Sequence, residues 1–176
     1  MHEADRSRRR ASLGHLDGLT KLLLPKDRLR DVAPDELEGR NQRSALFKTM
    51  FLAFRAAGAR DWHSNLAIAL GHRGVQHRLQ FHHIFPKAVL KGNHTAREAD
   101  DIANLAFIGG KTNRQISDKP PSQYFPALLE KASRAGFDAQ CIPTEPAVLG
   151  VGTYKQFLAE RRLAVSRRLN EFLGVP

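Results

Sequence analysis

The chain has 176 residues, a length that suits one domain or a small catalytic module with helical additions. Lysine and arginine outnumber aspartate and glutamate by 28 to 18, so nucleic acid is the favoured partner and a merely solvated basic surface is the alternative. The single cysteine, Cys141, excludes an internal disulfide framework and a cysteine-rich zinc site. With no apolar run of transmembrane length and no secretory signal, we expect a cytoplasmic protein without membrane contact.

The N-terminal segment, residues 1–40, is polar, rich in arginine and interrupted by prolines, so we expect it to be partly ordered at best. A helix is predicted over residues 44–57, because apolar side chains recur on one face and Gly58 is a typical stop. Asp61 is predicted to cap a second, short helix that ends near Leu70.

The middle of the chain changes character. Residues 79–85 are predicted to form a strand that Pro86 ends, followed by a loop to Ala103. Residues 105–108 are predicted to form a second strand, and two glycines make a turn into a short helix over residues 111–117.

Two more helices are predicted in the C-terminal part. Ser122 is expected to cap a helix that ends near Ala135, with Pro126 tolerated in its first turn. Thr153 and Gln156 predict a capping box at the start of the last helix, which Gly174 ends. Four arginines lie beside or opposite the apolar stripe of this helix and are expected to be solvated, with phosphate contacts as the alternative: Arg161, Arg162, Arg167 and Arg168.

Two adjacent histidines, His82 and His83, follow the first predicted strand. Phosphodiester hydrolysis needs a base to activate water, a cation to offset charge on the phosphoryl oxygens, and basic side chains to hold the backbone. A neutral imidazole suits the base, because its pKa lies near working pH. Since neighbouring strand residues face opposite ways, the pair suits two different roles better than two identical ones.

Three ordered blocks then follow: His-His-Ile-Phe-Pro-Lys at 82–87, Ile-Ala-Asn-Leu at 102–105, and Thr-Asn-Arg-Gln-Ile at 112–116, before Lys119, Pro121, Ser122 and Tyr124. Their order and spacing resemble the HNH (ββα-metal, or His-Me finger) nuclease superfamily. The match is closer to the C-terminal HNH domain of GmrSD-type restriction proteins. The resemblance covers about residues 61–124, roughly a third of the chain.

This resemblance implies an α+β protein with a small ββα-metal centre packed among helices. The nuclease domain is expected to span residues 41–176. Its parts are a helical segment at 41–75, the metal centre at 76–119 and the C-terminal helices at 120–176.

The resemblance also implies residue roles. His83 matches the general base, and Asn104 matches the asparagine that braces the loop and orients the base. His82 and Asn113 match the two metal ligands. The basic side chains expected to contact phosphates are Lys87, Lys111 and Arg114. Asp100 and Asp101 are interpreted as caps of a turn before Ile102, with a carboxylate in the site as the alternative.

One divalent metal ion is expected, with Mg²⁺ or Mn²⁺ preferred. Because His82 stands where many relatives carry aspartate, Ni²⁺ or Zn²⁺ is an alternative. Many HNH proteins also hold a structural zinc through cysteines, whose places Gly109 and Thr112 take here, so no structural zinc is expected.

The function expected from the resemblance is a metal-dependent endonuclease that hydrolyses DNA in defence against foreign or modified DNA. DNA is then the partner, and an upstream nucleotide-dependent sensing region is expected in the same system. Two alternatives stay open: an RNA-cleaving HNH toxin, and a non-catalytic DNA-binding module with the same fold.

Overall fold

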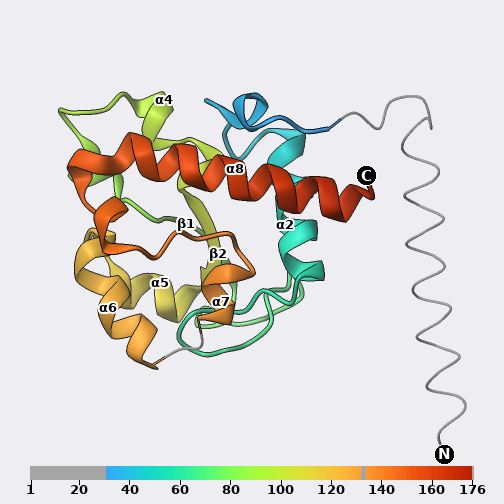
Figure 1. Cartoon of the computed structure of the whole chain (residues 1–176). Coiled ribbons are helices and arrows are strands. Elements are labelled where there is room, and N and C mark those ends of the chain that lie inside the picture. Colours follow the sequence, from blue (N-terminus) through green and yellow to red (C-terminus); the bar gives the residue numbers. More distant parts are fainter. Residues whose placement is uncertain (1–30, 132–133, 176) are drawn as a thin grey trace, which may run out of the picture. The chain divides into compact units, whose positions relative to one another are not determined.

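Two antiparallel strands, β1 (Leu79–His83) and β2 (Leu105–Gly109), lie at the centre of the fold (Figure 1). The computed structural model describes residues 31–131 and 134–175. His82 lies opposite Ala106 in the register. Helices pack around this pair, which confirms the predicted α+β class.

The two strands separate two apolar clusters, because side chains alternate between the faces of a strand. Ala106 and Ile108 belong to one cluster, and Leu105 and Phe107 belong to the other. The first cluster also contains Trp62, Phe85, Phe125 and Phe137. The second also contains Phe47, Met50, Phe51 and Phe54.

The first long helix, α2 (Ala45–Ala56), supplies the aromatic side of the second cluster. Ser44 caps it by accepting a hydrogen bond from the backbone of Phe47, and Gly58 follows it with φ +77°. Gly58 confirms the predicted end of this helix, and Ser44, predicted to be helical, is its cap. Phe47 packs against Phe107 with ring centroids 5.0 Å apart, which ties α2 to β2.

The second short helix predicted after Asp61 is wrong, because residues 57–78 form turns and an isolated bridge between Arg60 and Ala67. Asp61 still binds backbone amides, those of His63 and Ser64, but it closes a turn. Before α2, the 3-10 helix η2 (Pro34–Leu37) packs against the last helix. Residues 1–30 of the predicted N-terminal segment lie outside the described residues.

The predicted loop between the strands contains three short helical elements. These are α3 (Lys87–Leu90), α4 (Ala96–Ala99) and the 3-10 helix η3 (Ile102–Asn104). Thr95 and Glu98 form a capping box at α4. Asp101 accepts hydrogen bonds from the backbone of Ala103 and Gly39, so it caps η3 as predicted.

The helix α5 (Gly110–Ile116) begins directly after β2. Gly110 cannot carry a side chain, because a Cβ there would lie 2.3 Å from the carbonyl oxygen of Val75. The next helix, α6 (Pro121–Lys131), begins one residue before Ser122, so the predicted cap is wrong and Ser122 is a helical residue. Pro126 lies inside α6.

A short connection covers the outer edge of β2. It contains α7 (Ala135–Asp138) and the 3-10 helices η4 (Pro146–Val148) and η5 (Val151–Thr153). The side chain of Gln140 accepts from Phe107 N at 2.8 Å and donates to Phe107 O at 2.9 Å. Gln140 thus satisfies this edge in place of a third strand, and the outer edge of β1 is the other edge of the sheet.

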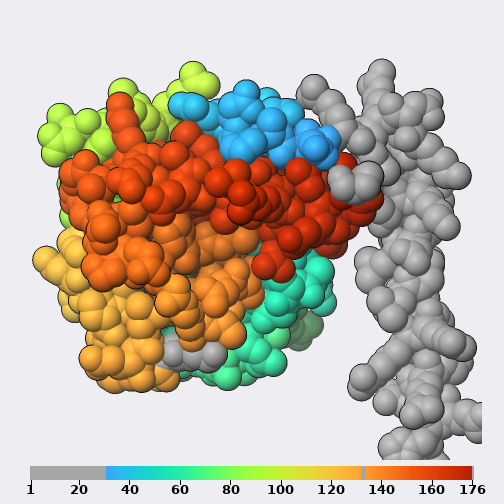
Figure 2. All heavy atoms as spheres, viewed as in Figure 1, coloured from blue at the N-terminus to red at the C-terminus, as the bar shows by residue number. Residues whose placement is uncertain are grey.

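The last helix, α8 (Tyr154–Leu173), crosses the view in front of the strand pair in Figure 1 and forms a continuous ridge in Figure 2. It ends at Gly174 with φ +68°, as predicted. The predicted capping box is wrong, because Thr153 Oγ1 donates to Gly150 O and Gln156 bonds to Glu160.

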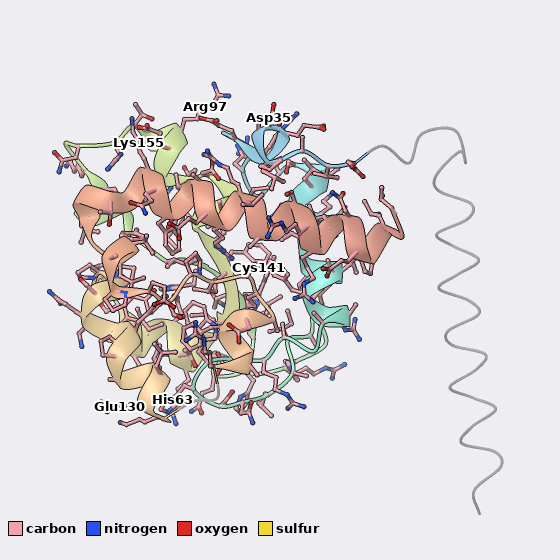
Figure 3. The ribbon with its side chains drawn as sticks, in the orientation of Figure 1. Asp35, His63, Arg97, Glu130, Cys141 and Lys155 are labelled. Atoms are coloured by element: carbon pink, nitrogen blue, oxygen red, sulfur yellow. The ribbon has the colours of Figure 1, made fainter. Side chains whose placement is uncertain are left out.

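Arg161 corrects the expectation that the arginines of α8 are solvated. Its side chain is fully buried, donating to Ala103 O at 2.7 Å and to Gln140 O at 3.2 Å. Burial lowers the pKa of Arg161 to about 10. Cys141 lies next to α8 in Figure 3, its thiol contacts the carbonyl oxygen of Ala164, and it is a buried free thiol. Within the described part of the chain, no helix is both long and apolar enough to span a bilayer.

Candidate active site

His82 lies on the inner face of β1 and is almost completely buried, with 4% of its surface exposed. Its ring makes edge contacts with Trp62 and Tyr124. Burial lowers the pKa of His82 to about 4, although a hydrogen bond with Asn113 opposes this shift. His82 is therefore neutral at physiological pH and keeps one ring lone pair for a ligand.

The side chain of Asn113 meets His82 from α5. Its Oδ1 lies 2.8 Å from Nδ1 of His82, and Tyr124 Oη lies 3.5 Å from Nε2 on the other side of the ring. Tyr124 itself donates to the carbonyl oxygen of Ile84 at 3.0 Å. The structure thus brings together the two side chains predicted to hold a metal ion.

The donor pair of His82 and Asn113 fits a hard or borderline divalent ion. Two neighbouring ligands of an octahedral ion that each stand about 2.1 Å from it are about 3 Å apart. The separation of 2.8 Å between Nδ1 and Oδ1 matches that edge. Nδ1 donates to Oδ1 in the hydrogen bond seen here, so the ring would hold an ion through Nδ1 in its other neutral tautomer, with the hydrogen on Nε2. The described residues contain no cluster of three or more His, Cys, Asp or Glu side chains suited to a metal, so water and phosphate would complete such a shell.

His83 points to the other side of the strand and keeps 28% of its side chain exposed. Its Nε2 lies 3.0 Å from Oδ1 of Asp100, and Nζ of Lys87 lies 2.6 Å from the same oxygen. Partial burial alone would raise the pKa of Asp100, but the hydrogen bonds from Lys87 and His83 outweigh it and lower that pKa. An ionised Asp100 accepts Nε2–H, which leaves Nδ1 of His83 as the proton acceptor.

Asn104 is buried and holds the start of the loop that follows β1. Its Nδ2 donates to Phe85 O and Ala99 O, both at 3.0 Å, and its Oδ1 accepts from Phe85 N at 2.8 Å. Its backbone carbonyl also accepts from Ile84 N. Through these bonds Asn104 fixes the backbone on which His83 and Lys87 stand.

Both histidines open into one cleft of about 500 Å³ along β1. The cleft is lined by Phe81, His82, His83, Pro86, Lys87, Ala88, Asn113, Arg114, Ser117 and Asp118. Two of the three predicted phosphate contacts, Lys87 and Arg114, thus lie in the cleft. Lys111 is exposed in the first turn of α5 and is not part of the cleft lining.

A buried carboxylate, that of Asp61, joins Gly109 to Thr112. Asp61 accepts from Gly109 N at 2.6 Å and from Thr112 Oγ1 at 2.7 Å. It also accepts from Ser64. Burial alone would raise the pKa of Asp61, but these hydrogen bonds lower it, so the carboxylate stays ionised. Asp61 therefore links the turn before α5 to the loop after α2.

Sequence reasoning missed the part that Asp100 plays. We interpreted it as a cap, but its side chain binds His83 and Lys87, so that interpretation is wrong for Asp100 and right for Asp101. The alternative of a carboxylate in the site was the better one. Lys87 begins α3 and Asp100 follows α4, so the two are thirteen residues apart and no local pattern links them.

Comparisons with known proteins leave the family open. No family model matches the chain, and no solved structure matches it. A stretch of 61 residues is 36% identical to an uncharacterized protein of Methanocaldococcus jannaschii. That stretch is 34% of this chain and 10% of the archaeal protein, so the chain spans about a tenth of its relative's length.

Proposed function

We propose that this chain is a metal-dependent HNH-type endonuclease that hydrolyses phosphodiester bonds of DNA. The observation that carries the proposal is that two histidines with different partners line one cleft. A neutral histidine pairs with an asparagine oxygen there, and a second histidine beside it pairs with a carboxylate. A binding module would need the positive surface but neither of these pairs.

His83 is the base in this proposal. Its Nε2 is engaged by Asp100, so Nδ1 takes a proton from a water molecule that attacks the phosphorus. Lys87 neutralises Asp100 and, with Arg114, offers positive charge to the non-bridging oxygens of the bound strand. Asn104 keeps the backbone of this loop in place through its three side-chain hydrogen bonds.

His82 and Asn113 are the residues that would hold a divalent ion. When bound, such an ion supplies charge that stabilises the phosphoryl oxygens and the departing oxygen. Mg²⁺ or Mn²⁺ is the preferred ion, and the imidazole donor leaves room for Ni²⁺ or Zn²⁺. The packing of Trp62 and Tyr124 around His82 keeps the ring neutral and fixed in direction.

The biological setting follows from the same resemblance. A GmrSD-type relationship supports restriction of foreign or modified DNA, with a nucleotide-dependent sensing region acting upstream of the nuclease. The net charge of +10 supports electrostatic capture of a nucleic acid.

The test is cleavage of defined substrates by EDTA-treated protein with and without added Mn²⁺ or Mg²⁺. Matched single-stranded and duplex DNA and RNA of one sequence serve as substrates, and His83→Ala serves as the negative control. We expect DNA cleavage that needs the metal and is lost in the variant. Faster cleavage of RNA would favour an RNA-cleaving toxin, and binding without cleavage of any substrate would leave a binding module.

A further inference from the structure

Phe81 is a large apolar side chain that stays exposed at the catalytic cleft. It keeps 47% of its surface exposed, and it lines the cleft together with His82 and His83. Phe81 stands two residues before His83, so both side chains leave the same face of β1 about 7 Å apart. Leaving so much of a phenylalanine in water costs free energy that burial would recover.

The ring of Phe81 is held in one orientation. Phe47 contacts it with ring centroids 5.0 Å apart and an angle of 89° between the planes. Phe107 contacts it at 5.8 Å and 88°. Perpendicular contacts of this kind are favourable aromatic pairs, so the two neighbours fix the ring while the rest of it stays open to the cleft.

We propose that Phe81 is a stacking platform for one unpaired nucleobase of the strand whose phosphate lies at His83. This inference rests on the proposed function and adds a substrate class to it: single-stranded DNA, or a duplex with a locally unpaired segment. A base inside a duplex is covered by its neighbours, whereas an unpaired base offers its face to an aromatic ring.

The surroundings of Phe81 fit a nucleic acid strand. Lys87 and Arg114 line the same cleft and supply positive charge for the phosphates. A basic groove combined with an exposed aromatic side chain is the arrangement that binds single strands without sequence preference. Phe107 lies opposite Phe81, and its backbone N–H and C=O point away from β1, toward Gln140. In an antiparallel pair, the backbone groups of the opposite residue then point away as well, so those of Phe81 face the outer edge of β1.

The experiment uses the full chain in EDTA, so that binding is measured without cleavage. The probes are a single-stranded DNA oligonucleotide carrying 2-aminopurine and its fully paired duplex. Binding and quenching of the 2-aminopurine are measured for the parent, Phe81→Leu, Phe81→Ala and Phe81→Trp. The matched control is Phe172→Ala, which removes another exposed phenylalanine (39% exposed) from α8.

We expect Phe81→Leu and Phe81→Ala to weaken single-strand binding about tenfold and to lose the quenching. Phe81→Trp should retain both, and duplex binding should change little in every variant. Phe81→Leu decides the matter if the alanine variant does not fold, because leucine preserves the apolar contact with Phe47. Melting temperatures establish which variants are folded.

The inference is overturned if Phe81→Leu binds and quenches like the parent, or if single-strand and duplex affinities fall equally. Cleavage is measured separately with metal. If the chain never cleaves but its single-strand binding needs an aromatic side chain at position 81, the proposed nuclease is contradicted and the base platform stands. If Phe81→Leu cleaves single-stranded DNA as fast as the parent, only the base platform is contradicted.

Discussion

His82 and His83 are neighbours on one strand, yet they lie in opposite environments. His82 is packed between Trp62 and Tyr124 and is neutral because burial lowers its pKa to about 4. His83 is partly exposed and bonds to an ionised carboxylate, Asp100. The strand period of two residues creates this difference, because it sends one ring toward α5 and α6 and the other toward the loop after β1.

The comparison shows how a short motif can place two histidines in different environments, which under the proposed function serve two chemical roles. A dehydrated, fixed imidazole suits a ligand, since it need not change its protonation state. A partly hydrated imidazole with a carboxylate partner suits a base, since it must exchange protons with water. Substitutions on the His82 side should therefore alter stability and metal binding, whereas substitutions on the His83 side should alter the rate of cleavage.

Replacing His83 by alanine should lower the single-turnover cleavage rate by about 10²–10⁴-fold, because a general base typically contributes that much. Binding of DNA should change little, because phosphate contacts supply most of the affinity. The rate is measured at saturating protein, and His63→Ala, an exposed histidine outside the cleft lining, is the control. A rate within a few-fold of the parent would remove His83 from the base role.

Acid should destabilise the protein through His82. Its folded-state pKa of about 4 lies below the usual 6.5, so the unfolded chain takes up the proton first as pH falls. The free energy of unfolding that neutral His82 contributes is fully present above about pH 6.5. It declines between about pH 6.5 and 4 and is lost below about pH 4, a total change of about 3 kcal/mol. Urea unfolding of the parent and His82→Gln at several pH values measures it. Parallel pH curves for the two proteins would contradict the buried, neutral ring.

Removing the amide oxygen of Asn113 should weaken metal binding and so raise the metal concentration that cleavage needs. In Asn113→Ala, we expect the Mn²⁺ concentration for half-maximal rate to rise about 10- to 100-fold, the range seen when the support of a metal site is lost. The maximal rate at saturating Mn²⁺ should recover in part. Ser117→Ala, at the end of the same helix in the same cleft, should leave the metal requirement unchanged.

Replacing Asp100 by asparagine should lower the catalytic rate constant about tenfold and leave KM nearly unchanged, a smaller effect than loss of the base itself. Asparagine can still accept a hydrogen bond from His83, but it carries no charge to stabilise the protonated ring. Asp118→Asn, which changes an acidic residue of the cleft lining that has no bond to His83 among those described, is the control. Equal losses in the two variants would mean that Asp100 acts only through the overall charge of the cleft.

The smallest expected effect concerns the basic side chains. Arg114→Ala should reduce the slope of log affinity against log salt by about one, because each phosphate contact releases condensed counterions. Lys111→Ala should change the slope less, since Lys111 lies outside the cleft lining. Salt titrations of duplex binding for the two variants distinguish them, and equal changes would contradict the cleft as the path of the strand.

Local patterns predicted the elements that carry strong signals. The strand pair, α2 with its stop at Gly58, α5 and the end of α8 at Gly174 all follow from apolar periodicity and terminal residues. The helix cap at Asp61 was wrong because Gly109 and Thr112, distant in sequence, bond to its carboxylate. The Thr153 box was wrong because Thr153 and Gln156 bond to other local partners, Gly150 and Glu160, and the Ser122 cap was wrong because α6 begins earlier.

The site was predictable only where residues share a motif. His82 and Asn113 meet because β1 and α5 are joined through β2, so a motif spacing fixes their approach. Asp100 and the buried Arg161 depend on long-range packing, which a periodic pattern does not encode. The position of Arg161 in α8, four residues after Phe157 and four before Val165, lies within the apolar stripe and indicates burial. The pattern does not reveal its partners, the carbonyl oxygens of Ala103 and Gln140.

The most direct test of the divided roles is a Mn²⁺ titration of the free protein followed by NMR, because a paramagnetic ion broadens the signals of nearby residues even when it binds weakly. The titration is run on the parent, His82→Ala and His83→Ala. We expect broadening centred on Asn113 and Tyr124 in the parent and in His83→Ala, and its loss in His82→Ala. Broadening that is lost in His83→Ala but kept in His82→Ala, or that centres on Asp100, would contradict the assignment of the metal to the buried histidine.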